Sequence, residues 1–411
     1  MITVNRHTLP NGLRIVHHED KDTQMVALNV LYNVGARDEH PDHTGFAHLF
    51  EHLMFGGSVN IPDYDTPLQL AGGENNAYTT NDLTNYYITL PASNIETAFW
   101  LESDRMLSLA FTPESLEVQR KVVMEEFKQH YLNQPYGDVS HLVASMAYKK
   151  HPYRWPTIGL KLEHISETTM DEVKDFFFRF YAPNNAILSV TGNITFEKTV
   201  QLAEKWFGDI PRRNIDLTSI PQEPPMQRQR RMTVRRNVPS PLLYMAFPIV
   251  NRIHPDFNAC DMISDILANG HSSRLYKRLV EQDKLFTSID AYVSGRIDTG
   301  LLYIVGMPAD GISMKEAEKA VWQQLDILCH ELVTDYELEK VKNKFETNLA
   351  METTDYQHNA AEMAYFEMLG DADLINHEAE NYRRVTATHL RQVCRRVLRR
   401  KNSCVLHYKC K

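Results

Sequence analysis

The two halves of the chain show the same order of predicted elements, and this internal repeat limits the folds that the sequence can adopt. In each half, alternating apolar stretches typical of strands precede a helix, two more strands and long helices. The closing segments, residues 165–190 and 385–408, also share a threonine-rich start, an amphipathic helix, an asparagine-containing break and a final strand. We therefore predict an α+β fold of two homologous domains, each a mainly antiparallel sheet packed with helices.

Prolines mark the boundary between the halves. Residues 220–225 read Ile-Pro-Gln-Glu-Pro-Pro, and five arginines follow, at positions 228, 230, 231, 235 and 236. We interpret this stretch as a solvated interdomain linker, in preference to a basic patch for an acidic partner. A chain of 411 residues also exceeds what one hydrophobic core usually serves. The predicted organisation is a domain at 1–215, a linker at 216–240 and a second, homologous domain at 241–411.

The charge balance excludes some classes of partner. The chain has 44 basic and 53 acidic side chains and a net charge of -9, whereas a dedicated binder of nucleic acids or anionic membranes presents a net basic surface. No apolar run reaches the roughly 18 residues that a membrane helix needs. The sequence therefore indicates a soluble enzyme or a large binding scaffold, with no nucleic-acid or membrane partner.

Cysteine usage and the first residues of the chain bear on its cellular compartment. The five cysteines include no C-x-x-C pair, which favours reduced thiols over a disulfide framework. The first 20 residues lack the basic start and the apolar core of a signal peptide, and Asn11-Gly12 instead favours a tight hairpin turn. We expect a cytoplasmic protein; a periplasmic protein whose export signal had been removed is the alternative.

The sequence His-Leu-Phe-Glu-His at 48–52 has the spacing of a helical metal site. On a helix, His48 and His52 stand one turn apart on the same face, where two imidazoles can converge on one Zn²⁺. Glu51 reaches the same patch and can accept a proton from a water molecule, the role of a general base. A chain with 18 histidines can also present this spacing by chance. The surroundings favour the metal site, because a loop rich in Asp, Pro and Gly precedes it and two glycines follow it.

A catalytic zinc site needs a third protein ligand and leaves a fourth position open. A later predicted helix, at residues 113–132, offers two adjacent carboxylates, those of Glu125 and Glu126. This helix lies far enough along the chain to be separate from the histidine helix. The residues alone do not choose between the two carboxylates.

H-x-x-E-H is the inverted zinc motif of one class of metallopeptidases, and nearly the whole chain resembles the M16 (pitrilysin-like) family. In that family the third zinc ligand is a glutamate inside a pattern like E-R-x-V-V-x-E-E. Residues 119–126 read Gln-Arg-Lys-Val-Val-Met-Glu-Glu, so the resemblance implies a Zn²⁺ ion held by His48, His52 and Glu126. It further implies that Glu51 is the catalytic base of a zinc-dependent endopeptidase, which cleaves oligopeptides or short unfolded polypeptides with a metal-activated water.

One residue departs from the family pattern. Gln119 stands where the family usually has glutamate, two turns before Glu126 on the same helical face. The neutral amide removes one negative charge near the expected metal but leaves the three ligands and the base in place. We therefore expect a working site with a slower reaction. Glu125 points about 100° away from Glu126 and is at most an outer carboxylate.

Residues 72–87 resemble the substrate-binding strand of the family. The resemblance implies that Asn76, Ala77 and Tyr78 form a sheet edge whose backbone pairs with an extended peptide. Affinity would then come from main-chain hydrogen bonds. The structural alternative is an ordinary buried hairpin strand, and the neighbouring metal motif favours the substrate strand.

The second half lacks the residues for this chemistry. Where the metal helix would repeat, residues 260–270 contain no histidine. Active family members hold the substrate carbonyl with an Arg and a Tyr seven residues apart, and Val280 and Thr287 occupy those places here. Neither can donate a charge-assisted hydrogen bond to an oxyanion. The resemblance therefore implies a heterodimer with a homologous, zinc-free M16 subunit that supplies the Arg/Tyr pair and closes a clam-shell chamber.

Two other functions stay open at this point. One is a structural or assembly subunit that kept a peptidase fold. The complete set of predicted metal ligands argues against this alternative. The other is a presequence-processing peptidase, which shares the mechanism and differs in its substrate. The sequence does not choose between substrates, because the shape and charge of the chamber depend on the partner.

Overall fold

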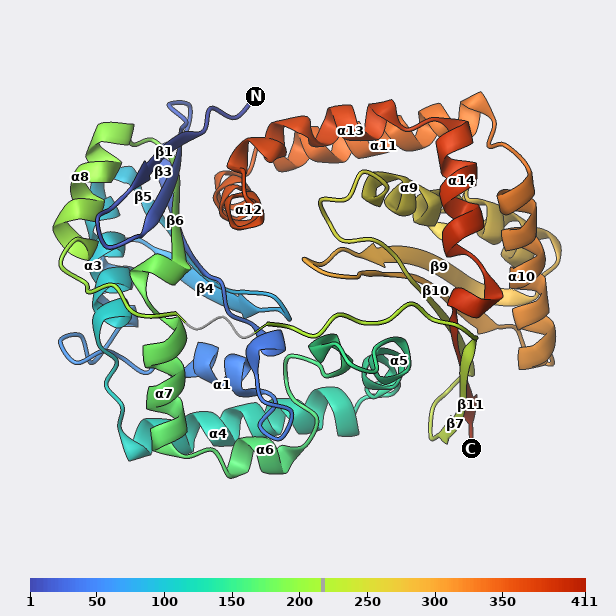
Figure 1. The fold of residues 1–411 in the computed structure, drawn as a ribbon, viewed down its shortest axis with the longest axis horizontal. Coiled ribbons are helices and arrows are strands. Elements are labelled where there is room, and N and C mark those ends of the chain that lie inside the picture. Colours follow the sequence, from blue (N-terminus) through green and yellow to red (C-terminus); the bar gives the residue numbers. More distant parts are fainter. Residues whose placement is uncertain (216–218) are drawn as a thin grey trace. The chain divides into compact units, whose positions relative to one another are not determined.

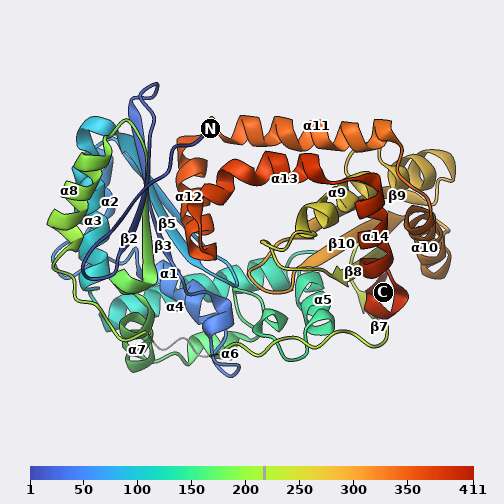
Figure 2. The same cartoon turned by 45° about the horizontal axis from the view of Figure 1, so that its top comes forward.

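A computed structural model describes residues 1–215 and 219–411, and the contacts within it divide the chain into two compact units. Unit 1 comprises Met1–Gln129, Trp155–Ile220 and Ala350–His377, and unit 2 comprises His130–Arg154, Pro221–Leu349 and Glu378–Lys411. Each unit contains one β-sheet with helices packed against it (Figures 1 and 2). The predicted α+β fold with two sheet-based units is confirmed.

Unit 1 is built on a six-stranded sheet with the strand order β1-β2-β6-β3-β5-β4. Strands β2 and β6 are parallel, and the other neighbouring pairs are antiparallel. The central strands β3 and β6 are buried along nearly their whole length, because helices cover both faces of the sheet. The strands are β1 (Asn5–Thr8), β2 (Arg14–Glu19), β3 (Met25–Tyr32), β4 (Glu74–Thr79), β5 (Thr84–Pro91) and β6 (Ala186–Gly192).

Six helices of unit 1 lie in three groups. Helices α3 and α8 pack together on one face of the sheet, and α12 packs on the other face against β2, β3 and β6 (Figure 1). Helices α1, α4 and α6 contact one another, and α1 also contacts strand β4. The helices are α1 (Phe46–Leu53), α2 (Asp65–Leu70), α3 (Ile95–Leu107), α4 (Pro113–Phe127), α6 (Leu162–Ser166), α7 (Met170–Phe180), α8 (Phe196–Phe207) and α12 (Tyr356–Leu369).

Unit 2 is built on a five-stranded sheet with the order β7-β11-β8-β10-β9. Helices α9, α10 and α14 contribute to the core on one face, and α5 contributes to a second apolar cluster with residues of β8 and β11. The strands are β7 (Arg230–Arg236), β8 (Leu242–Pro248), β9 (Phe286–Ser294), β10 (Leu301–Pro308) and β11 (Cys404–Cys410). The helices are α5 (Val139–Ala147), α9 (Phe257–Ala268), α10 (Met314–His330), α13 (Glu378–Arg384) and α14 (Ala387–Val397), and α11 (Asp335–Glu352) begins in this unit.

The two sheets repeat the same topology. In unit 1 the order β2-β6-β3-β5-β4 has one parallel pair followed by three antiparallel pairs, and the order β7-β11-β8-β10-β9 in unit 2 has the same pattern. The internal repeat predicted from the order of elements is therefore present as a repeat of sheet topology.

The predicted linker at 216–240 is partly wrong. Residues 216–218 lie outside the described residues, but Arg230–Arg236 form strand β7, paired in parallel with β11. Met232 and Val234 pack against an apolar cluster of unit 2, while their neighbours Arg231, Thr233 and Arg235 are exposed. This alternation is the ordinary pattern of a half-buried strand, which the surrounding prolines and arginines hide in the sequence.

The units also differ from two contiguous domains, because two segments lie outside the half from which they come. Helix α5 belongs to unit 2, where Val143 joins a cluster with Leu406. Helix α12 belongs to unit 1, where Met363 joins a cluster with Leu31. The spacing of apolar residues predicts the buried face of such a helix, but it does not say which sheet that face covers.

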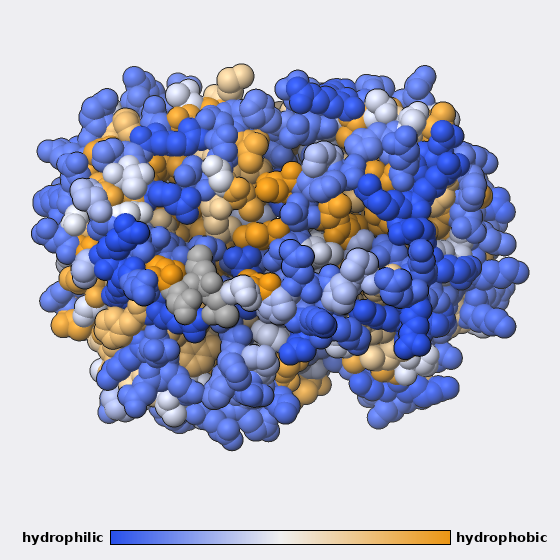
Figure 3. Space-filling model, viewed as in Figure 1, coloured by the Kyte–Doolittle hydropathy of each residue, from blue (hydrophilic) through white to orange (hydrophobic). Residues whose placement is uncertain are grey.

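The surface view in Figure 3 is mostly hydrophilic, with smaller apolar areas between the polar residues. Among the residues that the structure describes, no helix combines the length and the apolar composition needed to cross a membrane.

Candidate metal centre

Helix α1 has a fixed starting point. It begins directly after Gly45, whose backbone has a φ of 89° and whose α-carbon faces the carbonyl oxygen of Ile158, so that a side chain would clash there. The buried carboxyl group of Glu39 accepts hydrogen bonds from the amides of Gly45 (3.0 Å) and Ala47 (2.8 Å). These bonds satisfy amides that the start of a helix leaves unpaired, and they fix the position of α1.

The two faces of α1 have different surroundings. Leu49 and Phe50 are fully buried, and the ring centroid of Phe50 lies 4.4 Å from that of Tyr181. His48 and His52 lie on the opposite face, with side chains 19% and 21% exposed and ring centroids 4.8 Å apart. The packing of the apolar face therefore directs both imidazoles towards helix α4. The helix that the spacing of His48 and His52 predicts is present, as Phe46–Leu53.

Helix α4 brings the third predicted ligand to the two histidines. Leu116, Val123 and Phe127 are buried and hold one side of this helix against unit 1. The Oε2 atom of Glu126 lies 3.7 Å from Nε2 of His48 and 3.5 Å from Nε2 of His52. One donor atom from each of these three residues lies within 4.8 Å of the others. The structure thus brings together the three side chains that the sequence names as metal ligands.

The donor set of this cluster fits a zinc ion. Zinc takes histidine nitrogens and carboxylate oxygens at ~2.0–2.2 Å, and catalytic sites use three protein ligands. Two imidazoles and one carboxylate, already within 4.8 Å of one another, meet both requirements with small adjustments of the side chains. All three side chains are partly buried, so the cluster lies in a partly solvent-excluded position.

Glu51 lies beside the cluster without being part of it. Its Oε2 atom accepts a hydrogen bond from the hydroxyl group of Thr79, on strand β4. Burial raises the pKa of the Glu51 carboxyl group above its usual value and Glu126 adds to this effect, while Thr79 and His52 act in the opposite direction. The carboxylate of Glu51 therefore binds a proton more readily than a glutamate in water.

Two other residues of α4 were singled out in the sequence, Glu125 and Gln119. The carboxylate of Glu125 is exposed and forms an ion pair with Nζ of Lys128 at 2.6 Å. Gln119 is half-buried two turns earlier on the same helix. Of the two adjacent carboxylates, that of Glu126 lies at the histidines and that of Glu125 pairs with Lys128. The structure thus distinguishes two candidate ligands that the residues alone did not.

Strand β4 forms one edge of the unit 1 sheet. Asn76, Ala77 and Tyr78 pair with β5 on one side only, and β4 has no strand on its outer side among the described residues. The amide of Ala77 donates a hydrogen bond to Oδ1 of its neighbour Asn76 at 2.8 Å. The strand is partly exposed along its whole length, unlike an ordinary buried hairpin strand. Its role in binding substrate stays a prediction.

Sequence reasoning did not find Glu39 and Thr79. Glu39 lies before the loop that leads into α1, and Thr79 belongs to strand β4, which contacts α1. One signal was present: side chains alternate along a strand, so Ala77 and Thr79 face the same side. The contact of Thr79 with Glu51 becomes visible only when β4 and α1 are placed together.

The two residues at the expected Arg/Tyr positions lie in unit 2. Val280 is in a π-helical turn, Tyr276–Gln282, and packs against the core of the unit. Thr287 is exposed on strand β9, where its hydroxyl group donates to the carbonyl oxygen of Met307 at 3.3 Å. Neither side chain offers a cationic or phenolic donor.

Comparisons with known families agree with this fold. Residues 14–160 match the family model described as insulinase (peptidase family M16), and residues 167–345 match the model described as the peptidase M16 inactive domain. The chain belongs to the M16 peptidase family.

Three relatives illustrate the extent of the similarity. The zinc protease PqqE of Helicobacter pylori is 29% identical over 343 residues, which cover 82% of this chain and 77% of that protein. In the crystal structure of a protease from Helicobacter pylori, the chain is 26% identical in sequence to this one and superposes with a TM-score of 0.93 over the whole of both chains. The crystal structure of pitrilysin has the same fold, with 16% identity and a TM-score of 0.78 over 99% of this chain and 45% of the pitrilysin chain.

Proposed function

We propose that this chain is a zinc-dependent endopeptidase that cleaves oligopeptides or short unfolded polypeptides. The observation that carries the proposal is the convergence of His48, His52 and Glu126 from two helices, with the carboxylate of Glu51 beside them. The name of the relative from Helicobacter pylori, a zinc protease, supports both the metal and the reaction.

Each side chain has one role in this proposal. His48, His52 and Glu126 would hold the ion through two imidazole nitrogens and one carboxylate oxygen. Zinc, when bound, supplies the Lewis acidity that makes water a nucleophile near neutral pH. Glu51 would accept a proton from the attacking water and donate it to the amine of the leaving product. The hydroxyl group of Thr79 would hold Glu51 in the orientation for this transfer.

The outer edge of β4 would align the substrate. An extended peptide can add to a free sheet edge through main-chain hydrogen bonds, whatever its side chains. The position of β4 at the end of the strand order and its contact with α1 support this role for Asn76, Ala77 and Tyr78. Such binding suits oligopeptides and unfolded segments, because a folded substrate rarely offers an extended backbone.

We further propose that the active form is a heterodimer with a homologous, zinc-free subunit. Val280 has no hydrogen-bond donor in its side chain, and the hydroxyl group of Thr287 already donates to the carbonyl oxygen of Met307, so another chain would contribute the cationic and phenolic donors. The chain spans 45% of pitrilysin, which supports the idea that it corresponds to one half of a larger enzyme of this fold.

The substitution Glu51→Gln tests the peptidase proposal. It should reduce peptide cleavage by at least about a hundredfold, because a neutral amide cannot accept the proton of the attacking water. The zinc content should stay that of the wild-type chain, measured by plasma emission spectrometry on the same preparation. Full activity in this variant would contradict the proposal, and loss of zinc would make Glu51 a ligand.

A cytoplasmic location is also proposed. All five cysteines are free thiols and four of them are buried, which suits a reducing compartment. Cell fractionation should recover the protein with cytoplasmic markers, and recovery in a periplasmic fraction would overturn this location.

A further inference from the structure

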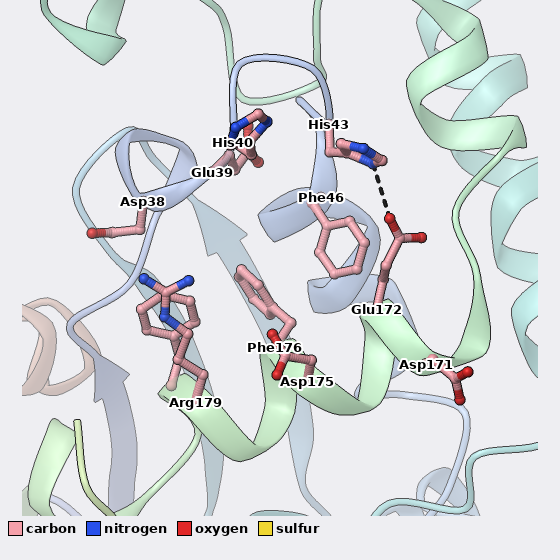
Figure 4. Close-up of a pocket in the computed structure, with 11 residues that line it drawn as sticks. Asp38, Glu39, His40, His43, Phe46, Asp171, Glu172, Asp175, Phe176 and Arg179 are labelled. Atoms are coloured by element: carbon pink, nitrogen blue, oxygen red, sulfur yellow. Dashed lines mark ion pairs between the residues drawn. The ribbon is translucent and has the colours of Figure 1, made fainter. Parts of the chain in front are cut away.

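Unit 1 contains a second site of interest, a pocket of about 370 Å³ that none of the proposed metal-centre residues lines. The loop before α1 and one face of α7 form it, and both segments belong to unit 1 (Figure 4). Its volume falls within the range of pockets that bind small molecules or single side chains.

The floor of the pocket is aromatic. The ring centroid of Phe176 lies 5.0 Å from that of Phe46 and 4.9 Å from that of Phe180. These three side chains are at most 8% exposed, yet all of them line the pocket. The pocket therefore offers a rigid apolar bed to the body of a ligand.

The rim of the pocket is acidic. Five carboxyl groups line the pocket, against one guanidinium group and two imidazoles. One of the five, that of Glu39, is buried and already accepts two backbone hydrogen bonds at the start of α1. Glu172 is already engaged at one end, by an ion pair with Nδ1 of His43 at 3.1 Å (Figure 4). Asp175 is exposed beside Phe176, and its carboxylate makes no hydrogen bond or ion pair within the described part of the chain. An uncompensated negative charge thus borders the aromatic floor.

The pocket already holds one cation of the chain in this manner. The guanidinium carbon of Arg179 lies 4.7 Å from the centroid of the Phe180 ring. A guanidinium group over an aromatic ring is a favourable arrangement. Phe176 presents a second ring a short distance along α7, with the carboxylate of Asp175 next to it in the chain.

We propose that this pocket binds an amphipathic organic cation, a guanidinium or ammonium group attached to an apolar body. The body would lie on the rings of Phe46 and Phe176, and the charge would lie beside Asp175. An arginine side chain of a polypeptide and a free small molecule share this chemistry. The proposal is independent of the peptidase function, because it uses none of the residues of the metal centre.

Benzylguanidine tests the proposal, with benzylurea as the neutral probe of nearly the same shape. Calorimetric titration of the full chain should show saturable binding of benzylguanidine at one site. Benzylurea should bind at least about tenfold more weakly, because it keeps the ring and loses the charge. Absence of saturable benzylguanidine binding, or equal binding of the two probes, would overturn the proposal.

Two matched variants locate the binding. Asp175→Asn should weaken benzylguanidine binding about threefold to tenfold, because it removes the unpaired carboxylate. Asp209→Asn removes the same charge from an exposed position of unit 1 outside the pocket and should leave the affinity within about twofold. Equal affinities in these variants would place the site elsewhere and contradict the proposal. An acetylated Gly-Arg-Gly amide tests whether the natural ligand is part of a polypeptide. Tighter binding of this peptide than of benzylguanidine indicates an arginine side chain of a polypeptide, and weaker binding indicates a free small molecule.

Discussion

The hydroxyl group of Thr79 holds one oxygen of Glu51, the proposed base. We predict that Thr79→Val lowers kcat by about tenfold to a hundredfold with little change in KM, because one hydrogen bond to a charged group contributes about 1.5–3 kcal/mol. Thr79→Ser keeps the hydroxyl group and should restore most of the rate. Steady-state kinetics on the three proteins, with zinc content measured alongside, tests this role.

Two outcomes would contradict this role of Thr79. A valine variant with the wild-type kcat would show that the hydrogen bond does not orient Glu51. A serine variant as slow as the valine variant would show that the methyl group and its packing matter, and not the hydroxyl group.

The sequence predicts the positions of some residues of the metal centre better than those of others. His48, Glu51 and His52 share one short helix, so their spacing alone predicts that they meet. Glu126 comes from another helix and sits next to Glu125, and only the resemblance to a known family distinguished the two. Thr79 lies 28 positions from Glu51, and no local pattern connects a strand residue with a helix residue at that separation.

At the scale of elements, the free edge of β4 provides a specific test of substrate binding. The amide of Ala77 donates a hydrogen bond to the side chain of its neighbour Asn76. Ala77→Pro removes this backbone donor from an edge strand, the kind of strand in which proline is tolerated. We predict a fall in kcat/KM of about tenfold, mostly through KM, with unchanged zinc content.

Ala77→Ser is the matched control, because it keeps the amide and changes the size little. Peptide-cleavage kinetics should show nearly wild-type behaviour for serine and the loss for proline. Equal kinetics for the proline variant and the wild type would mean that substrates do not pair with this edge.

Elements with an undisturbed pattern were predicted from the sequence. Helix α7 and strand β6 are the amphipathic helix and the final strand predicted within residues 165–190, and α1 is the helix predicted to carry His48 and His52. Strand β7 was missed because arginines occupy its exposed positions and prolines precede it. The assignment of α12 to unit 1 was also missed, since an amphipathic helix shows that it has a buried face but not which sheet covers it.

At the scale of the whole molecule, the proposed heterodimer has a kinetic consequence, because this chain would hold the metal and its partner would supply the oxyanion donors. We predict that the zinc-loaded chain alone cleaves peptides at least about a hundredfold more slowly than a complex with the homologous zinc-free subunit, because removing an oxyanion donor costs a factor of about 10²–10³. Co-expression with homologous chains, followed by cleavage assays with and without a chelator, measures the difference. Equal rates for the isolated chain and the complex would refute the heterodimer and leave the metal centre unaffected.

The zinc content of Glu126→Gln, measured beside that of Glu125→Gln, tests the central claim most directly. The two variants lose the same charge at adjacent positions of α4, but only Glu126 lies beside the two histidines. After exhaustive dialysis, the wild-type chain and Glu125→Gln should retain one zinc ion per chain, and Glu126→Gln should lose most of it. Stoichiometric zinc in Glu126→Gln, or none in the wild-type chain, would contradict the account.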